Sequence, residues 1–353
     1  MKLLIYGDVH WSKTSSVVDM QGKKFTKRIE LLIDSMNWVN DLAVEQQCEA
    51  TICAGDFFHR TTVAAQETTA LLQIHWADMP HYFLVGNHEA EGLNLEYRTI
   101  DILDSNSEFN NKFIISEPCW NWVIGDTQLH FIPYIEEVGR KPIEDYLDKE
   151  LNSKGDYLKQ VIISHNDIAG ILYGGFPSKI GFNIEEIENN CDLFLNGHIH
   201  NSEWVTNKVL NLGSLSGHNF TNDSSKYNYG AWILDTETLQ ITFFENPYSL
   251  NFYKLSITEE GDLQQLYQLK PNAVVSVQCT HTLLPVINDA LKTLKETGKI
   301  ITSKLSTIYE AVDCTEAKIE DLSLDHLAEL TSFCKAKLGT SEVLDAELAE
   351  ICK

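Results

Sequence analysis

The sequence predicts an α/β fold, because short and continuous apolar runs alternate along the chain with stretches of helical periodicity. Runs of this kind are typical of strands that are buried in a layered sheet. Those that matter most for function are 3–6, 51–53, 82–85, 161–163 and 192–195. The segment 25–44 instead spaces its large apolar side chains as a helix does, at Ile29, Leu32, Ile33, Met36 and Val39.

A short polar motif follows each of the five runs. In order, the motifs are Asp8-Val9-His10, Gly55-Asp56-Phe57-Phe58-His59, Gly86-Asn87-His88-Glu89, Ser164-His165-Asn166 and Gly197-His198-Ile199-His200. In α/β folds the chemistry collects in the loops beyond the carboxyl ends of the strands. Aspartate, histidine and asparagine that converge there suit divalent cations, with enough ligands for two. One motif alone would favour a structural role, but five in order predict a metal centre.

These motifs resemble the pattern D-x-H, G-D, G-N-H-[DE], H and G-H-x-H of the calcineurin-like metallophosphoesterase family, over about residues 1–245. The resemblance implies a four-layer α/β/β/α sandwich of mixed sheets. It also implies that one metal ion is held by Asp8, His10, Asp56 and His200. The other would be held by the bridging Asp56 together with Asn87, His165 and His198. His88 would lie beside the scissile phosphate without being a ligand.

His59 indicates a branch of that family. It completes a G-D-x-F-H run that resembles the SbcD-type DNA repair nucleases and their phage recombination-endonuclease relatives, in which this histidine sits by the substrate. The alternative is that His59 only caps the following helix. Glu89 stands where this branch usually has aspartate, and Leu212 where the family usually has proline. His59 and His88 are therefore the predicted catalytic histidines.

The chemistry of a phosphodiester suits such a centre. Two divalent ions about 3.5–4 Å apart lower the pKa of a shared water and clamp the phosphoryl oxygens. The mixture of oxygen and nitrogen ligands suits Mn²⁺ better than Mg²⁺ and also accepts Fe²⁺ or Zn²⁺. We therefore expect two divalent ions, Mn²⁺ in the first place.

The net charge of −24 argues against tight binding of DNA by this chain alone, since phosphate neutralisation dominates nucleic-acid affinity. A local basic cluster follows the first motif, at Lys23, Lys24, Lys27 and Arg28. These side chains either contact DNA phosphates or form a solvated helix start. The acidity implies that a partner holds the duplex.

Three domains are expected: a nuclease domain at 1–246, a small α+β capping domain at 247–283 and a C-terminal helical region at 284–353. In the SbcD-type relatives, the C-terminal helices dock on an SMC-like ATPase subunit. Packing of these helices on the chain's own core is the alternative. The chain carries no phosphate loop of its own, so ATP use would lie on another polypeptide. The resemblance also implies a homodimer.

Composition favours a cytoplasmic protein (the host cytoplasm for a phage protein) with no membrane segment, because no apolar run approaches spanning length. The eight cysteines form no C-x-x-C pair and are predicted to be reduced thiols.

The remaining strands are expected at 113–115, 120–124, 128–132, 203–205, 208–212, 230–234, 240–245, 252–257 and 273–277. Helices are expected at 26–47, 63–77, 93–104, 139–152, 183–189, 262–268, 284–297, 322–338 and 341–351. Loops at 174–175 and 216–229 are expected beside the metal site.

Three classes of function follow. The first is a metal-dependent DNA nuclease, the catalytic subunit of an SbcCD-like recombination and repair complex. The second is a stand-alone phosphodiesterase or phosphoprotein phosphatase, which would explain the acidity and Glu89. The third, a non-catalytic scaffold, is disfavoured because every expected metal position is filled.

Overall fold

The computed structural model describes residues 1–13, 22–91, 94–103, 111–118, 120–147, 158–173, 176–221 and 224–307. By their contacts, the residues of the chain divide into two compact units, Met1–Ser306 and Thr307–Lys353. The expected helices at 322–338 and 341–351, and with them most of the predicted C-terminal region, lie outside the described residues.

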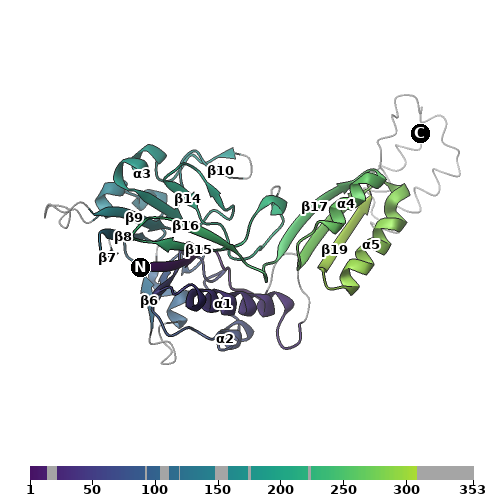
Figure 1. The fold of residues 1–353 in the computed structure, drawn as a ribbon, viewed down its shortest axis with the longest axis horizontal. Helices are drawn as coiled ribbons and strands as arrows, with labels where there is room; N and C mark the ends of the chain where they lie inside the picture. Colours follow the sequence, from purple (N-terminus) through teal and green to yellow (C-terminus); the bar gives the residue numbers. More distant parts are fainter. Residues whose placement is uncertain are drawn as a thin grey trace, which may run out of the picture. The chain divides into compact units, whose positions relative to one another are not determined.

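Two six-stranded sheets form the large part of the first unit (Figure 1). The first sheet has the order β16-β15-β1-β2-β3-β6, with β1 Lys2–Tyr6, β2 Ala50–Cys53, β3 His81–Leu84, β6 Lys112–Ile115, β15 Gly230–Asp235 and β16 Ile241–Glu245. The second has the order β13-β14-β12-β9-β8-β7, with β7 Trp120–Ile124, β8 Thr127–Ile132, β9 Lys159–Ser164, β12 Leu193–Asn196, β13 Glu203–Trp204 and β14 Val209–Asn211. Both sheets are mixed, because each combines parallel pairs, such as β1–β2 and β9–β12, with antiparallel pairs, such as β1–β15 and β7–β8.

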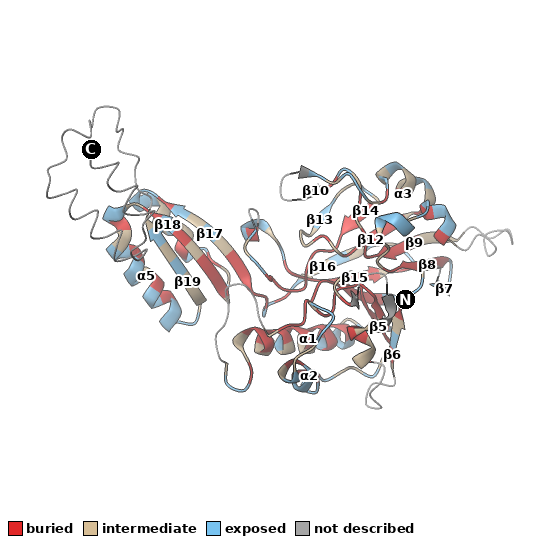
Figure 2. Cartoon of the chain, turned by 180° about the vertical axis from the view of Figure 1, so that it is seen from behind, coloured by how far each residue is buried: buried red, intermediate tan, exposed pale blue. Residues whose placement is uncertain are grey.

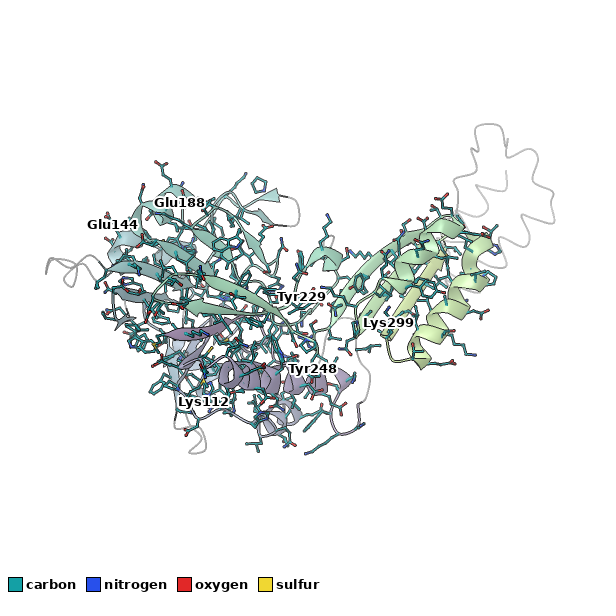
Figure 3. The ribbon with its side chains drawn as sticks, in the orientation of Figure 1. Lys112, Glu144, Glu188, Tyr229, Tyr248 and Lys299 are labelled. Carbon is teal, nitrogen blue, oxygen red and sulfur yellow. The ribbon has the colours of Figure 1, made fainter. Side chains whose placement is uncertain are left out.

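Alternation along the strands builds the layers. On β1, Leu4 and Tyr6 pack with α1 (Lys27–Glu45) and α2 (Ala65–Leu71), whereas Leu3 and Ile5 face the second sheet. On β9, Ile162 packs on the opposite side with α3 (Ile184–Asn190). Buried side chains fill the space between these layers (Figures 2 and 3). The predicted four-layer α/β/β/α sandwich is confirmed.

Helix α1 shows how the sequence sets one of these layers. Thr26 caps it, because its hydroxyl oxygen accepts a hydrogen bond from the Ile29 backbone N–H. The apolar stripe expected from periodicity is buried against the first sheet, as Ile29, Leu32 and Met36 show.

All the strands expected within the described residues are present, but two expected helices are wrong. The segment 93–104 contains β5 (Asn94–Arg98), which pairs with β4 (Ala90–Glu91), and then the 3₁₀ helix Thr99–Ile102. Pairing between neighbouring strands overrides local helical periodicity here. The described part of 139–152 forms only 3₁₀ turns, Glu137–Gly139 and Ile143–Tyr146. Helix α2 is also shorter than the expected 63–77.

Two short ribbons complete this region. One is the β4–β5 pair, and the other joins β10 (Leu172–Tyr173) to β11 (Phe176–Pro177). The described helices include none that is long and apolar enough to cross a membrane. Among the cysteines that the structure describes, Cys48, Cys53, Cys191 and Cys279 are free and buried.

A small three-stranded sheet, β17-β18-β19, follows the sandwich. Its strands are β17 Asn251–Ile257, β18 Ala273–Cys279 and β19 Ile300–Thr307, and its helices are α4 Gln264–Tyr267 and α5 Leu284–Glu296. The α+β character is as expected, and the core of this sheet extends past the expected boundary between residues 283 and 284. Helix α5 packs through Ile287 and Leu291 into the same core as Val275 and Val277 of β18. Strand β19 was not predicted, and Lys299 (Figure 3) lies in the turn before it.

Candidate metal centre and active site

The five polar motifs lie just beyond the carboxyl ends of β1, β2, β3, β9 and β12, and the backbone ties them together. The Asp8 N–H donates to the Gly55 carbonyl oxygen at 3.1 Å, and the His10 N–H donates to the Asp56 carbonyl oxygen at 3.0 Å. On the second sheet, the Gly197 N–H donates to the Ser164 carbonyl oxygen at 2.8 Å. The His198 N–H donates to the Asp8 Oδ2 atom at 3.1 Å, so the loops of both sheets meet at one edge of the sandwich.

Four of the predicted ligands have left-handed backbone conformations. Their φ angles are 50° at Asp8, 48° at His10, 51° at Asp56 and 70° at His198. A residue with a side chain is strained in this conformation. Such strain persists only where the surrounding structure holds it, commonly at functional sites. The strain marks these four positions independently of their chemistry.

Two glycines of the motifs are required because no side chain fits at their positions. A Cβ atom on Gly86 would lie 2.1 Å from the Asp56 Oδ1 atom, and one on Gly55 would lie 2.2 Å from the His165 Nδ1 atom. Gly55 also has a φ angle of 95°. The backbone therefore passes directly against the side chains of two predicted ligands, which only glycine allows.

One group of ligand atoms comes from Asp8, His10 and His200, all within 4.8 Å of one another. The Nε2 atoms of His10 and His200 lie 2.9 Å apart, and the His200 Nε2 atom lies 3.6 Å from the Asp8 Oδ1 atom. That carboxylate oxygen is buried and has no hydrogen-bond partner among the described residues. A cation would satisfy it, so this donor set fits a divalent metal ion.

A second group comes from Asp56, His165 and His198. The His165 Nδ1–H donates to the Ala54 carbonyl oxygen at 2.7 Å, which leaves Nε2 free of its proton in the neutral ring. That Nε2 atom lies 3.2 Å from the Asn87 Oδ1 atom and 3.4 Å from the Asp56 Oδ2 atom. Lone pairs that face each other in this way fit a cation between them.

Asp56 joins the two groups. Its Oδ2 atom lies 3.4 Å from the His165 Nε2 atom and 3.9 Å from the His10 Nε2 atom. The structure thus brings all seven predicted ligands together and puts Asp56 where a bridging carboxylate is expected. That each of them binds metal stays a prediction.

The negative charges of the buried carboxylates at the site need a nearby positive charge to be stable. Burial, together with the negative charge of Asp56, raises the pKa of Asp8 to about 8. Burial also opposes ionisation of Asp56, but the positive charge and hydrogen bond of His165 hold the pKa of Asp56 well below its ordinary value. Burial and the neighbouring His200 lower the pKa of His10. Burial opposes protonation of His165, but the negative charge and hydrogen bond of Asp56 raise the pKa of His165 to about 9. A divalent cation at these carboxylates would take the place of that proton.

His59 and His88 form a third group with His10, again within 4.8 Å. The His88 Nδ1–H donates to the His59 carbonyl oxygen at 2.7 Å, so its Nε2 atom lies on the opposite side of the ring, 3.9 Å from the Asp56 Oδ2 atom. His59 does not merely cap a helix, because helix α2 is capped at Ala64. Both predicted catalytic histidines therefore reach the metal-ligand cluster.

Two further residues of the site, Asp167 and His218, escaped the sequence analysis, and Glu89 was named there without a role in the site. The Asp167 Oδ1 atom lies 3.2 Å from the His198 Nε2 atom, and the Glu89 carboxylate accepts from the backbone N–H groups of Phe58 and Gly86 at 3.0 and 2.6 Å. His218 packs against His59. An acid two residues after His165 could have been noticed, whereas a histidine in a loop rich in asparagine and serine carries no signal.

Arg28 corrects the predicted phosphate-contact cluster. Its side chain is buried, and its guanidinium donates to the carbonyl oxygens of Gly217 and His10 at 2.9 and 3.1 Å. It therefore cannot contact DNA from this position. Lys23 and Lys24 are exposed and Lys27 is half-buried, so these three remain available to a phosphate.

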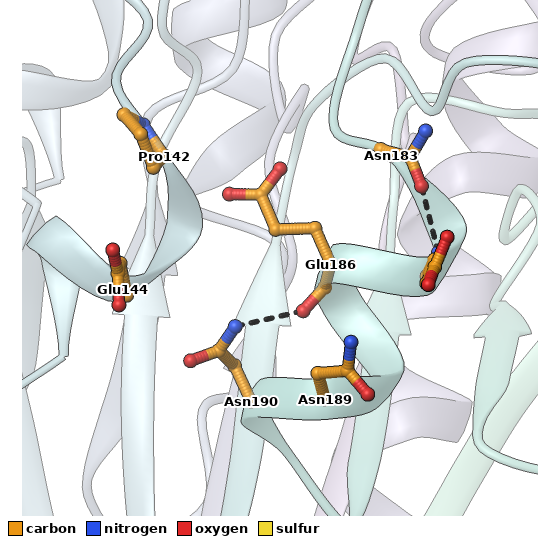
Figure 4. Close-up of a pocket in the computed structure, with 7 residues that line it drawn as sticks. Pro142, Glu144, Asn183, Glu186, Asn189 and Asn190 are labelled. Atoms are coloured by element: carbon orange, nitrogen blue, oxygen red, sulfur yellow. Dashed lines mark hydrogen bonds between the residues drawn. The ribbon is translucent and has the colours of Figure 1, made fainter.

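A separate surface pocket lies beside α3 (Figure 4). Its lining is acidic and amide-rich, with Pro142, Glu144, Asn183, Glu185, Glu186, Asn189 and Asn190. None of these residues belongs to the three groups of metal-ligating atoms. The candidate site is the cluster at the strand ends and not this pocket.

Known proteins share parts of this chain. Residues 1–202 match the family model described as calcineurin-like phosphoesterase. "Putative phosphoesterase 078R" of Invertebrate iridescent virus 3 is 24% identical over 141 residues, which cover 40% of this chain and 39% of that protein. The alignment thus spans about two fifths of the length of this curated relative.

Solved structures are similar at low identity. TT1561 of Thermus thermophilus is 12% identical, with a TM-score of 0.40, over 69% of this chain and 98% of that one. The calcineurin-like phosphoesterase YfkN from Bacillus subtilis is 11% identical, with a TM-score of 0.33, over 69% of this chain and 88% of that one.

The family match covers more than half of the chain and includes every predicted metal ligand. Members of this family typically bind divalent metals, and the Asp and His groups at the strand ends could hold them. The chain therefore belongs to the calcineurin-like phosphoesterase family, a membership that implies a metal-dependent hydrolase.

Proposed function

We propose that the chain is a metal-dependent DNA nuclease, the catalytic subunit of an SbcCD-like recombination and repair complex. The observation that carries this proposal is the position of His59. Its ring packs against His88 at a centroid distance of 5.1 Å, beside the candidate metal ligands. By the resemblance of the G-D-x-F-H run to the SbcD-type nucleases, a histidine at this point sits by the substrate.

In this proposal, Asp8, His10, Asp56 and His200 hold one divalent ion, and Asp56, Asn87, His165 and His198 hold the other. When bound there, the two ions, Mn²⁺ in the first place, would lower the pKa of a shared water and compensate the charge of the phosphate. His88, with its Nδ1–H fixed on the His59 carbonyl oxygen, presents Nε2 to the phosphate or to the leaving oxygen.

The proposed protein partner follows from the net charge of the chain. A chain of net charge −24 binds duplex DNA weakly by itself, so we propose that an SMC-like ATPase subunit holds the duplex. That subunit would bind the C-terminal helical region expected at 284–353. We also propose a homodimer and a cytoplasmic location, the host cytoplasm for a phage protein.

The decisive experiment is Mn²⁺-dependent degradation of a linear, end-labelled duplex. Asp56→Asn and His88→Asn should abolish nucleotide release, whereas His75→Ala, at an exposed histidine paired with Asp41, should retain it. Elemental analysis should find metal in His88→Asn, because His88 is not a proposed ligand. Loss of metal from this variant would contradict its role.

The second candidate is a stand-alone phosphodiesterase or phosphoprotein phosphatase, which the acidity and Glu89 favour. It predicts hydrolysis of bis(p-nitrophenyl) phosphate without degradation of DNA. The DNA assay is then repeated with a candidate ATPase subunit. Cleavage on addition of that subunit supports the nuclease, and continued silence supports the stand-alone enzyme.

A further inference from the structure

His218 lies against the proposed catalytic histidine although it belongs to none of the five motifs. It follows β14 in the loop 212–221, and its side chain is 8% exposed. Its ring centroid lies 4.1 Å from that of His59 and 5.4 Å from that of His10. Its Nδ1 atom is buried and has no hydrogen-bond partner among the described residues. Ring packing, and not a hydrogen bond through Nδ1, is therefore its main contact with the site.

The backbone next to His218 is fixed from two sides. The Gly217 carbonyl oxygen accepts from the Arg28 guanidinium at 2.9 Å, and the Gly217 N–H donates to the Leu250 carbonyl oxygen at 3.0 Å. The Leu250 N–H in turn donates to the Ser216 Oγ atom at 3.0 Å. A Cβ atom on Gly217 would lie 2.3 Å from the Leu250 carbonyl oxygen, so the two segments pass too close for a side chain at this position. The position of His218 is thus set by the fold.

His59 has few other restraints. Its Nδ1 atom lies 3.4 Å from the Nδ1 atom of His10, a long contact, and the two rings meet edge to face at a centroid distance of 5.3 Å. Its ring is otherwise oriented by contact with His88, nearly parallel at 23°, and with His218 at 44°. An imidazole held mainly by packing turns when one of its neighbours is removed.

We propose that His218 is a positioning residue, whose ring holds the His59 imidazole in its reactive orientation. This inference rests on the proposed function of His59. The alternative is that His218 only fills space in the core. The two roles differ in one respect: a positioning residue acts through His59, and a space-filling residue acts on the whole fold.

A double-mutant cycle separates the two roles. His218→Ala should lower kcat by about tenfold with KM nearly unchanged, because misplacement of a reacting group affects turnover. His218→Phe, which keeps an aromatic ring, should restore most of the loss. In a His59→Ala background, His218→Ala should have no further effect. Additive losses, or equal losses in His218→Ala and His218→Phe, would overturn the proposal.

The cycle is run on both duplex DNA and bis(p-nitrophenyl) phosphate. Failure of the DNA assay both with and without the candidate ATPase subunit contradicts the proposed nuclease function, and the cycle can still be read on the small substrate. A chemical readout is independent of turnover. Modification of His59 by diethyl pyrocarbonate, followed by peptide mass spectrometry, should be several-fold faster in His218→Ala and unchanged in His218→Phe. Titration with Mn²⁺ should give the same affinity for the unaltered chain, His218→Ala and His218→Phe. Unchanged His59 modification in His218→Ala, or a loss of Mn²⁺ affinity, would reject the positioning role.

Discussion

The guanidinium of Arg28 donates a hydrogen bond of 3.1 Å to the backbone carbonyl oxygen of His10, from helix α1 into the first ligand loop. Its other bond reaches Gly217, 189 positions later in the chain. Arg28 is fully buried, and no ion pair joins it to an acidic side chain within the described ranges. Burial lowers the pKa of its guanidinium to about 10, so it is charged at neutral pH. A buried cation thus ties a proposed metal-ligand loop to the His218 loop.

Arg28→Met should destabilise the protein. It leaves two buried carbonyl oxygens without a donor, so we expect the free energy of unfolding to fall by about 2–4 kcal/mol. Arg28→Lys keeps the charge but cannot form both bonds, so its loss should be smaller but measurable. Urea denaturation measures both, with Lys27→Met as the control at the preceding position. Equal stability of Arg28→Met and Lys27→Met would show that the two bonds contribute nothing.

Asp167→Asn should weaken one metal site selectively. The His198 Nε2–H donates to Asp167 at 3.2 Å, which leaves Nδ1 without a proton and facing the Asn87 Oδ1 atom at 3.0 Å. An asparagine can present its amide N–H₂ to that ring nitrogen and favour the wrong tautomer. We expect a 10- to 100-fold loss in the affinity of the second metal, on the order found for such partners. Calorimetric titration with Mn²⁺ measures it.

The control for this titration is Asp126→Asn, at an exposed aspartate paired with Lys159. It should bind two ions as the unaltered chain does. A matching affinity at both sites in Asp167→Asn would mean that His198 needs no such orientation, or that it is not a ligand.

The predicted ligands could be identified from the sequence because each of the five motifs directly follows a strand of its own. The apolar run of β1 ends at Tyr6, and Asp8 and His10 come within four residues, so local pattern alone places them at the sheet edge. The family resemblance then supplied their pairing into two sites. The layers were predictable for the same reason, since apolar alternation determines which face of a strand is buried.

Features that depend on contacts between residues far apart in the chain could not be predicted from the sequence. Arg28 stands in a run of basic residues that suggests a solvated surface, and only its contact with Gly217 explains its burial. Strand β19 (Ile300–Thr307) alternates poorly, and it forms because it completes a sheet with β18. The role of His218 becomes visible only from its contact with His59, which lies far away in the sequence. Long-range partners override local preference at each of these positions.

Lys23 and Lys24 provide the test for DNA phosphate contact. Both are exposed, so the double variant Lys23→Met, Lys24→Met should weaken duplex binding with little change in stability. Removal of each phosphate contact should reduce the slope of log affinity against log salt by about 0.9. Fluorescence anisotropy at several salt concentrations, in an Asp56→Asn background that prevents cleavage, measures the slope. An unchanged slope would assign these lysines to a solvated helix start.

His81 provides a pH test outside the metal site. It is fully buried on β3, its Nε2–H donates to the Ala77 carbonyl oxygen at 3.0 Å, and its Nδ1 accepts from the Thr51 hydroxyl at 2.7 Å. Both bonds suit the neutral ring. Burial lowers the pKa of His81 to about 4, and the charge of its cross-strand neighbour Lys112 acts in the same direction. The Ala77 hydrogen bond opposes this shift only in part.

The sign of the pH dependence follows from this shift. Between about pH 6.5 and 4 the unfolded chain binds a proton at His81 that the folded chain does not, so the folded state loses stability as the pH falls through that window. A shift of this size corresponds to about 3 kcal/mol. His81→Gln, which does not titrate, should therefore show a shallower fall in unfolding free energy between pH 7 and 4.5 than the unaltered chain. Urea denaturation with chelator present measures it, because the site histidines then contribute equally to both chains. His75→Gln, at the exposed histidine, should keep the full pH dependence, and the same slope in His81→Gln would place the acid sensitivity of the fold elsewhere.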